Sequence, residues 1–453
     1  MPTDLSPDAL RAALDALPLY APTGRVLEAH GSSLVASLPG GRIGELCEIH
    51  DPDTGRTLEA EIVGFRDGLA LLAPSDDLAG LSLGARIRLT GRTRTVPAGD
   101  GLLGRVVDAA IRPIDGRGPV LDVAARLPLH RDPPAAMSRA LVNRPFRVGV
   151  RAIDGLLTCG VGQRVGVFGE PGCGKSMLLA SLVQGSEADV CVVGLIGERG
   201  REVREFVEDT LGAQAMARST VVVATSDRPA VERAQAAYAA TAVAEHFRDR
   251  GKRVLLVIDS LTRFARALRD IGLAAGEVPT RRGFPPSVFA ALPSLLERAG
   301  TAKRGSITAF HTILLEGDGT GDPIAEEVRS ILDGHVMLSS ELAARAHYPA
   351  IDVLRSRSRV MPAVADAAHK ADAARFLELR ARHDDVAFLV RVGEYQAGSD
   401  PVADRAIAQA PAMDAFLKQP AGERSAFDAT RAALTAAVGL ETAGGAADEG
   451  TAA

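Results

Sequence analysis

The sequence predicts an α/β protein whose mostly parallel sheet is preceded by a small β-barrel and followed by an α-helical C-terminal domain. Between residues 24 and 91, short runs of alternating apolar and polar residues are separated by frequent turns, which is typical of a small closed barrel. Between residues 151 and 362, strand and helix patterns alternate, which indicates a parallel sheet with helices on both faces. Residues 363–440 are rich in alanine, leucine and charge and carry almost no strand pattern, which favours helices.

These patterns divide the 453 residues into five parts. They are residues 1–22 as an N-terminal docking helix, 23–93 as the barrel, 94–362 as the core, 363–440 as the helical domain with a possible helical hairpin, and 441–453 as a disordered tail. Hydrophobic residues make up 46% of the chain, so it can build a large core.

The first helix is expected over residues 4–20, where Leu10, Leu14 and Leu17 recur at helical spacing. Two interpretations of this amphipathic segment stay open. It packs on its own domain, or it docks on a partner or a membrane surface.

The strands are expected where apolar runs lie between turn residues. In the barrel they are residues 25–30, 34–38, 46–50, 58–63, 69–72 and 85–89. In the core they are residues 164–168, 190–196, 220–225, 253–258, 306–314 and 335–339, with a long helix at 229–250. Residues 92–150, rich in Gly, Pro and Arg, are interpreted as a linker that contains one ordered piece at 102–108.

Charge and aromatic content argue against a dedicated nucleic-acid-binding protein. The net charge is −5, Trp is absent and aromatic residues make up 4% of the chain, whereas such proteins present basic patches and stacking rings.

The four cysteines are far apart and form no C-x-x-C pair, so neither a zinc site nor a disulfide framework is indicated. The sequence starts without a signal-peptide pattern, and no apolar run approaches the ~18 residues of a membrane span. The expected compartment is the cytoplasm.

A phosphate-binding loop follows the apolar run at 164–168 and opens a helix. Its residues are Gly169, Glu170, Pro171, Gly172, Cys173, Gly174, Lys175 and Ser176, which fit the pattern G-x-x-x-x-G-K-[ST]. The glycines allow backbone N–H groups to turn toward phosphates, and the helix N-terminus adds partial positive charge. Lys175 is expected to reach the β- and γ-phosphates and Ser176 to ligate Mg²⁺, so a nucleotide with Mg²⁺ is the expected ligand.

Two acidic residues follow apolar strands near this loop. In open α/β sheets ligands sit at the carboxyl ends of the strands. Asp259 is expected there to help hold Mg²⁺ through water. Glu198 could position the attacking water and Arg199 could contact the γ-phosphate, but their spacing equally allows a surface ion-pair cluster.

Arginines alternate in the segment 354–360. For Arg355 and Arg357 we expect solvated or ion-paired side chains. An arginine supplied by a neighbouring subunit can accelerate phosphoryl transfer by ~10³–10⁵.

Cys173, within the phosphate loop, has two interpretations. A helix N-terminus lowers a thiol pKa, so oxidation of Cys173 could block phosphate entry. The simpler interpretation is a tolerated small side chain, and we prefer it.

Six ordered motifs resemble the type III secretion ATPase family, which includes the flagellar export ATPases and is similar to the catalytic subunit of rotary ATP synthases. The motifs are residues 169–176, 197–202, 259–267, 285–289, 327–335 and 347–353, and the match runs from about residue 24 to about residue 439. The resemblance implies a RecA-like core between the barrel and the helical domain, ATP as the substrate, and a homohexameric ring with sites between subunits.

The same resemblance implies roles for single residues. Glu198 would be the carboxylate that orients water, and Arg199 would contact phosphate. Arg359 would be the finger that reaches the neighbour's nucleotide. Tyr348, which the sequence alone suggests as a core aromatic, would stack on adenine.

The implied function is ATP hydrolysis that energises type III protein secretion, with release of chaperones from export substrates and unfolding of those substrates. The ring would sit peripherally at the cytoplasmic, inner-membrane base of the secretion machine. The N-terminal helix would bind a regulator or stator protein. The C-terminal helices would meet a central stalk protein and chaperone–substrate complexes, and export-gate membrane proteins would be partners only indirectly. No nucleic acid is expected.

Some residues depart from the family pattern, and other functions stay open. Phe284 and His311 stand where relatives often carry Tyr, and Gly319 stands where a second acid is common. A flagellar export ATPase is an alternative, although residues 315–351 favour the non-flagellar branch. A hexameric RNA- or DNA-dependent translocase and a non-hydrolysing ring subunit are further alternatives; Glu198 argues against the latter.

Overall fold

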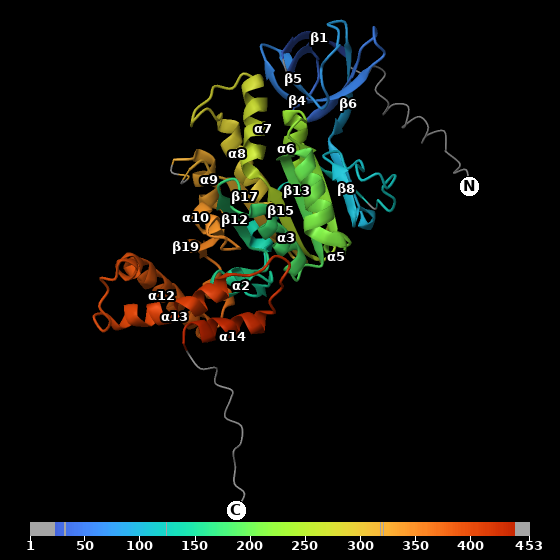
Figure 1. The fold of residues 1–453 in the computed structure, drawn as a ribbon. Coiled ribbons are helices and arrows are strands. Elements are labelled where there is room, and N and C mark those ends of the chain that lie inside the picture. Colours follow the sequence, from blue (N-terminus) through green and yellow to red (C-terminus); the bar gives the residue numbers. More distant parts are fainter. Residues whose placement is uncertain (1–22, 31–32, 124, 318, 320, 440–453) are drawn as a thin grey trace, which may run out of the picture.

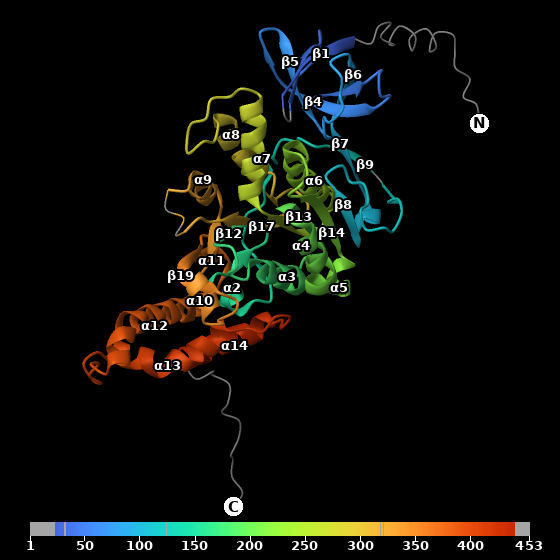
Figure 2. The same cartoon turned by 45° about the horizontal axis from the view of Figure 1, so that its top comes forward.

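The computed structural model describes residues 23–30, 33–123, 125–317, 319 and 321–439. The barrel lies at one end, the nucleotide-binding core in the middle and the C-terminal helices at the opposite end (Figure 1). The turned view in Figure 2 keeps this order. The expected N-terminal helix and the expected tail at 441–453 lie outside the described residues.

The barrel is closed by six strands within residues 23–93, in the order β1-β2-β5-β4-β3-β6. The strands are β1 (Thr23–His30), β2 (Ser33–Ser37), β3 (Glu45–His50), β4 (Thr57–Arg66), β5 (Leu69–Pro74) and β6 (Arg86–Thr93). Alternate apolar residues point inward, and Leu34, Ile49, Ile62, Leu72 and Ile87 are fully buried. The alternation therefore predicted both the strands and the closed barrel correctly.

In the described part of the chain, nine strands form the central sheet, with the path β19-β18-β12-β17-β15-β13-β14-β8 and β16 paired to β17. The strands are β8 (Arg105–Asp108), β12 (Arg164–Gly169), β13 (Val190–Glu198), β14 (Ser219–Thr225), β15 (Arg253–Asp259), β16 (Gly300–Thr301), β17 (Ser306–Leu314), β18 (Gly334–Leu338) and β19 (Ile351–Ser358). The pairs between β18 and β8 are parallel, whereas β19 and β16 pair antiparallel. All six expected core strands are confirmed.

Residues 92–150 are more ordered than the expected linker. The ordered piece expected at 102–108 is confirmed, because it contains β8, which extends the parallel sheet beside β14. The sequence pattern missed β7 (Thr95–Ala98) and β9 (Ala125–Pro128), which pair with each other, because strands of four residues are too short to show a period. A bidentate ion pair from Arg105 to Asp115, with Nε 2.7 Å from Oδ2, holds the chain where it folds back.

Helices cover both faces of the sheet, as expected (Figure 1). One core contains residues of α6 (Ala230–Asp249), α7 (Leu261–Ala274), α8 (Pro286–Leu296) and α9 (Pro323–Ile331). The other contains residues of α2 (Arg151–Leu156), α3 (Lys175–Gly185), α4 (Gly200–Glu205) and α5 (Gly212–Met216). The sheet is thus buried on both faces, which explains its continuous apolar strands.

Two of the departures from the family pattern are buried in the core of α6 to α9 or beside it. Phe284 packs edge-on against Phe289, with ring centroids 6.5 Å apart. His311 on β17 is fully buried, and neither ring nitrogen has a hydrogen-bond partner among the described residues. Burial lowers the pKa of His311 to about 3, so the ring is neutral.

The C-terminal domain is a helical hairpin with a third helix folded across its base (Figure 2). Its helices are α12 (Ala367–Val392), α13 (Pro401–Leu417) and α14 (Phe427–Ala437). Their buried residues join the core of α2 to α5, and the rings of Phe376 and Phe416 lie 5.4 Å apart. No helix among the described residues is long and apolar enough to cross a membrane.

Candidate functional site

The phosphate loop connects β12 to α3, as the motif requires. Gly172 (φ +87°) and Gly174 (φ +82°) adopt the left-handed conformation that other residues avoid. Gly174 also lies under Tyr348, because a Cβ there would approach the Cε1 atom of that ring to 3.1 Å. Ser176 is exposed in the first turn of α3, so its hydroxyl is accessible to a ligand at the helix N-terminus.

Lys175 and Asp259 form the central ion pair of the site. Lys175 Nζ lies 2.8 Å from Asp259 Oδ1, and both side chains are nearly buried. Thr312 on β17 donates a hydrogen bond of 2.6 Å to the same carboxylate oxygen. Sequence reasoning missed Thr312, because nothing in its local pattern marks it as polar support inside a buried strand.

Glu198 ends β13 on the same sheet edge. Its Oε2 atom lies 2.9 Å from Arg263 Nη1, and Arg263 also donates to the Gly197 carbonyl. Gly197 has φ +68°, and a Cβ there would come within 3.0 Å of the Arg263 side chain. Arg263, on α7, was also missed as a site residue. The Arg263 side chain links α7 to the end of β13 and fixes the position of the Glu198 carboxylate.

The surroundings raise the pKa of Glu198 to about 7. Burial is the largest cause and the negative charge of Asp259 the next, while Arg263 and Lys175 act in the opposite direction; a hydrogen bond to Glu202 raises it further. A carboxylate that titrates near the working pH is suited to accept a proton from water. The surface ion-pair interpretation fits Arg199 and Glu202, which are paired at 2.8 Å, better than it fits the nearly buried Glu198.

The structure does not bring the two predicted arginines to the phosphate loop. The Arg199 side chain is 76% exposed, and the residue directly precedes α4. Arg359 is exposed beyond the end of β19, with one long contact of 3.5 Å to the Arg329 carbonyl. Within the described residues, neither guanidinium bonds to the loop of its own subunit. Arg355 and Arg357 are exposed, as expected.

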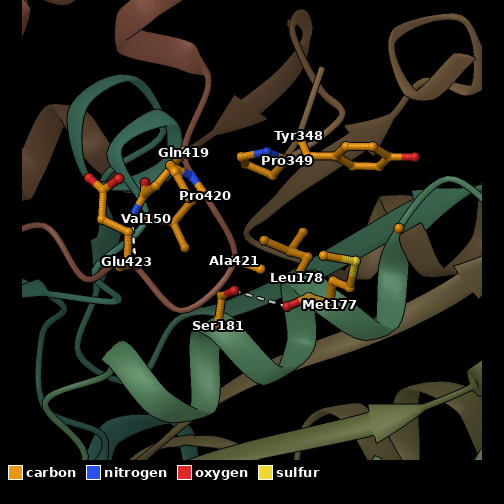
Figure 3. Close-up of a pocket in the computed structure, with 11 residues that line it drawn as sticks. Val150, Met177, Leu178, Ser181, Tyr348, Pro349, Gln419, Pro420, Ala421 and Glu423 are labelled. Atoms are coloured by element: carbon orange, nitrogen blue, oxygen red, sulfur yellow. Dashed lines mark hydrogen bonds between the residues drawn. The ribbon is translucent and has the colours of Figure 1, made fainter. Parts of the chain in front are cut away.

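A pocket lies beside the phosphate loop. Figure 3 shows Tyr348 and Pro349 above Met177 and Leu178 of α3, with Gln419, Pro420 and Ala421 completing the lining. An aromatic ring over apolar walls next to a phosphate loop is suited to bind a nucleobase. The residues from 419 to 423 were not predicted, because they lie about 70 residues beyond Tyr348 in the chain and only the tertiary fold brings them here.

Cys173 is not a reactive thiol in this structure. It is buried, and its S–H group donates to the Glu170 carbonyl at 2.8 Å. Burial raises the pKa of Cys173 and outweighs the opposing effect of Lys175. This environment disfavours the interpretation of Cys173 as an oxidation-sensitive thiol and fits the preferred one, a tolerated small side chain.

The donor set fits Mg²⁺ bound together with a nucleotide. Ser176 and Asp259 offer the hydroxyl and carboxylate oxygens that this hard cation prefers. No group of three or more His, Cys, Asp or Glu residues could hold a metal ion within the described ranges. Phosphate and water oxygens would complete the coordination.

Comparisons with known proteins agree with this geometry. Residues 149–358 match the nucleotide-binding domain of the ATP synthase alpha/beta family, and residues 365–436 match the T3SS EscN ATPase C-terminal domain. The type 3 secretion system ATPase of Sinorhizobium fredii is 60% identical over 90% of each chain. The flagellum-specific ATP synthase of Bacillus subtilis is 44% identical over 93% of this chain and 96% of its own.

Solved structures give the same result. The assembled ATPase EscN from the enteropathogenic E. coli type III secretion system superposes with a TM-score of 0.87 at 44% identity, covering 92% of this chain and all of EscN. EscN in complex with its central stalk EscO gives a TM-score of 0.84 with the same coverage.

The raised pKa of Glu198 predicts the pH dependence of turnover. Glu198 must be ionised to accept a proton, so kcat/KM for ATP should fall below a pH of about 7. Arg263 lowers this pKa, so Arg263→Ala should move the acid limb to higher pH. The measurement is a pH–rate profile.

Arg266→Ala is the matched control, because Arg266 lies on the same helix and pairs with the exposed Glu316. Its profile should equal that of the wild type. An acid limb that stays in place in Arg263→Ala, or moves to lower pH, contradicts the assignment of Glu198 as the titrating group.

Proposed function

The chain belongs to the type 3 secretion system ATPase family and is an ATPase, and we propose that it hydrolyses ATP at the site built on Lys175, Asp259 and Glu198. The observation that carries the proposal is the Lys175–Asp259 ion pair, at 2.8 Å, with the Glu198 carboxylate on the same sheet edge. Phosphoryl transfer needs a basic group that binds the phosphates, an acidic group that helps hold the metal ion, and a group that accepts a proton from the attacking water.

Each side chain has a defined task in this reaction. The phosphate loop binds the β- and γ-phosphates through its backbone N–H groups, and Lys175 neutralises their charge. Ser176 and, through water, Asp259 would hold Mg²⁺, which supplies charge stabilisation to the phosphate oxygens when bound. Glu198 orients the attacking water and accepts its proton. Tyr348 stacks on adenine in the adjoining pocket.

The arginine positions support a site shared between subunits. Arg359 is exposed and makes no contact with its own phosphate loop among the described residues. The similarity to assembled EscN supports a ring, and we infer a homohexamer in which Arg359 reaches the nucleotide of the next subunit. Arg199, which is free to leave its exposed pair with Glu202, would contact phosphate when the site closes.

The energy of ATP hydrolysis drives type III protein secretion. The steps within secretion are part of this proposal. Chaperone release and substrate unfolding would occur on a ring held peripherally at the cytoplasmic base of the machine. The end of α12 supports a stalk contact, since it exposes the apolar residues Phe388, Leu389, Val390 and Val392. EscN binds its central stalk EscO in a related structure. Residues 1–22 would bind the regulator.

Sequence identity to the named relatives distinguishes the secretion branch from the flagellar branch of the family. Identity to the Sinorhizobium secretion ATPase, 60%, exceeds identity to the Bacillus flagellar protein, 44%, which supports the non-flagellar branch. An RNA- or DNA-dependent translocase would instead show turnover stimulated by nucleic acid in a salt-dependent manner.

Glu198→Gln tests the assignment of the proton acceptor. The amide keeps the size of the side chain but cannot take a proton, so hydrolysis should fall by about 10²–10⁴ while nucleotide binding persists. Single-turnover hydrolysis and fluorescent-nucleotide titration measure the two quantities. Loss of binding together with hydrolysis would show that the role given to Glu198 is wrong.

The shared site predicts that turnover per subunit rises with protein concentration as rings form. Arg359→Ala should assemble normally and lose about 10³-fold or more in turnover, because a finger arginine contributes ~10³–10⁵. Arg357→Ala, on the preceding strand β19, is the control and should stay active. Turnover that does not depend on protein concentration, or an active Arg359→Ala variant, would contradict the claim of a shared site.

A further inference from the structure

The base-side wall of the pocket belongs to the C-terminal domain. Gln419, Pro420 and Ala421 follow directly on α13, the second helix of the hairpin, and line the pocket opposite Tyr348 (Figure 3). Lys418 alone separates Gln419 from the last residue of α13.

Gln419 connects three separate parts of the chain at this point. Its Oε1 atom accepts from Arg151 N at 2.8 Å, and its Nε2 atom donates to the Gly149 and Glu423 carbonyls, both at 2.8 Å. Its backbone N–H donates to the Tyr348 carbonyl at 2.9 Å. The side chain is 7% exposed, so these bonds are shielded from water and costly to break.

Arg151 holds the same loop from the opposite side. Its Nε atom donates to the Phe416 carbonyl at 3.0 Å, and its other nitrogens bond to the Lys418 carbonyl and the Glu423 carboxylate. The helix it begins, α2, packs closely on α13, because a Cβ at Gly155 would lie 2.7 Å from the Phe416 ring. The Gln419 side chain thus bonds to the backbone of Arg151, and the Arg151 side chain bonds to the backbone just before Gln419.

We propose that Gln419 is a positioning residue for nucleotide binding, whose side chain fastens the loop after α13 to the start of α2 and so holds Pro420 and Ala421 in place at the base pocket. This inference rests on the proposed function, in which Tyr348 stacks on the base. Both N–H groups of the Gln419 amide and its oxygen have protein partners. The side chain therefore acts on the base indirectly, by placing Pro420 and Ala421, while the backbone N–H of the same residue holds the Tyr348 carbonyl.

Gln419→Ala and Gln419→Glu test the proposal in steady-state kinetics of the full chain. Both should raise KM for ATP by roughly ten-fold, because the loop that carries Pro420 and Ala421 loses its attachment to α2, and leave kcat near the wild-type value, because the chemical groups are untouched. KM for GTP should rise by the same factor, since the amide does not read the base. Gln409→Ala, on the same helix, is the control and should match the wild type.

Hydrogen–deuterium exchange with and without the ATP analogue AMP-PNP separates positioning from a merely structural role. In the wild type, the analogue should protect residues 169–180 and also residues 413–423. In Gln419→Ala the first protection should remain and the second should disappear. An unchanged KM, or protection of 413–423 that survives in this variant, overturns the proposal, and a KM that rises for ATP alone shows direct base contact instead.

Tyr348→Ala distinguishes failure of this inference from failure of the base site. If Tyr348→Ala leaves KM for ATP unchanged, the pocket does not bind the base and the proposed function is wrong on that point. If Tyr348→Ala raises KM and Gln419→Ala does not, only the positioning role of Gln419 fails.

Discussion

The ion pair between Lys175 and Asp259 is the contact on which the rest of the site depends. It requires the loop after β12 and the end of β15 to lie at one sheet edge, and the strand order β12-β17-β15-β13 provides this. The same order places Thr312 between the two partners and Glu198 one strand beyond them. Helices packed on both faces of this parallel sheet hold the strands relative to one another, which keeps these groups together at one edge.

Sequence patterns predicted this edge well for a physical reason. The loop, Asp259 and Glu198 each follow a continuous apolar strand, and the carboxyl ends of parallel strands meet at one edge. Thr312, Arg263 and Gln419 escaped prediction because each acts through contacts between segments 50 or more residues apart. Strands β7 and β9 escaped because four residues carry no readable period. Tyr348 was assigned only through the family resemblance.

Two features fit the proposed ring and the proposed base site. The guanidinium of Arg359, the proposed finger, is exposed and makes no bond to the phosphate loop of its own chain within the described residues. Residues 419–421, which follow the second helix of the C-terminal hairpin, line the pocket beside Tyr348. The proposed catalytic groups thus lie on the sheet, while part of the pocket lining comes from the helical domain.

The central claim, that each active site draws on two subunits, is tested most directly by mixing two inactive variants. Lys175→Ala has no working phosphate loop but keeps Arg359, and Arg359→Ala has the reverse defect. In rings formed from an equal mixture, about a quarter of the interfaces would pair an intact loop with an intact finger if subunits assort at random. The account predicts that ATP turnover reappears on mixing. Turnover no greater than the sum of the separate variants, in rings shown to contain both, would contradict it.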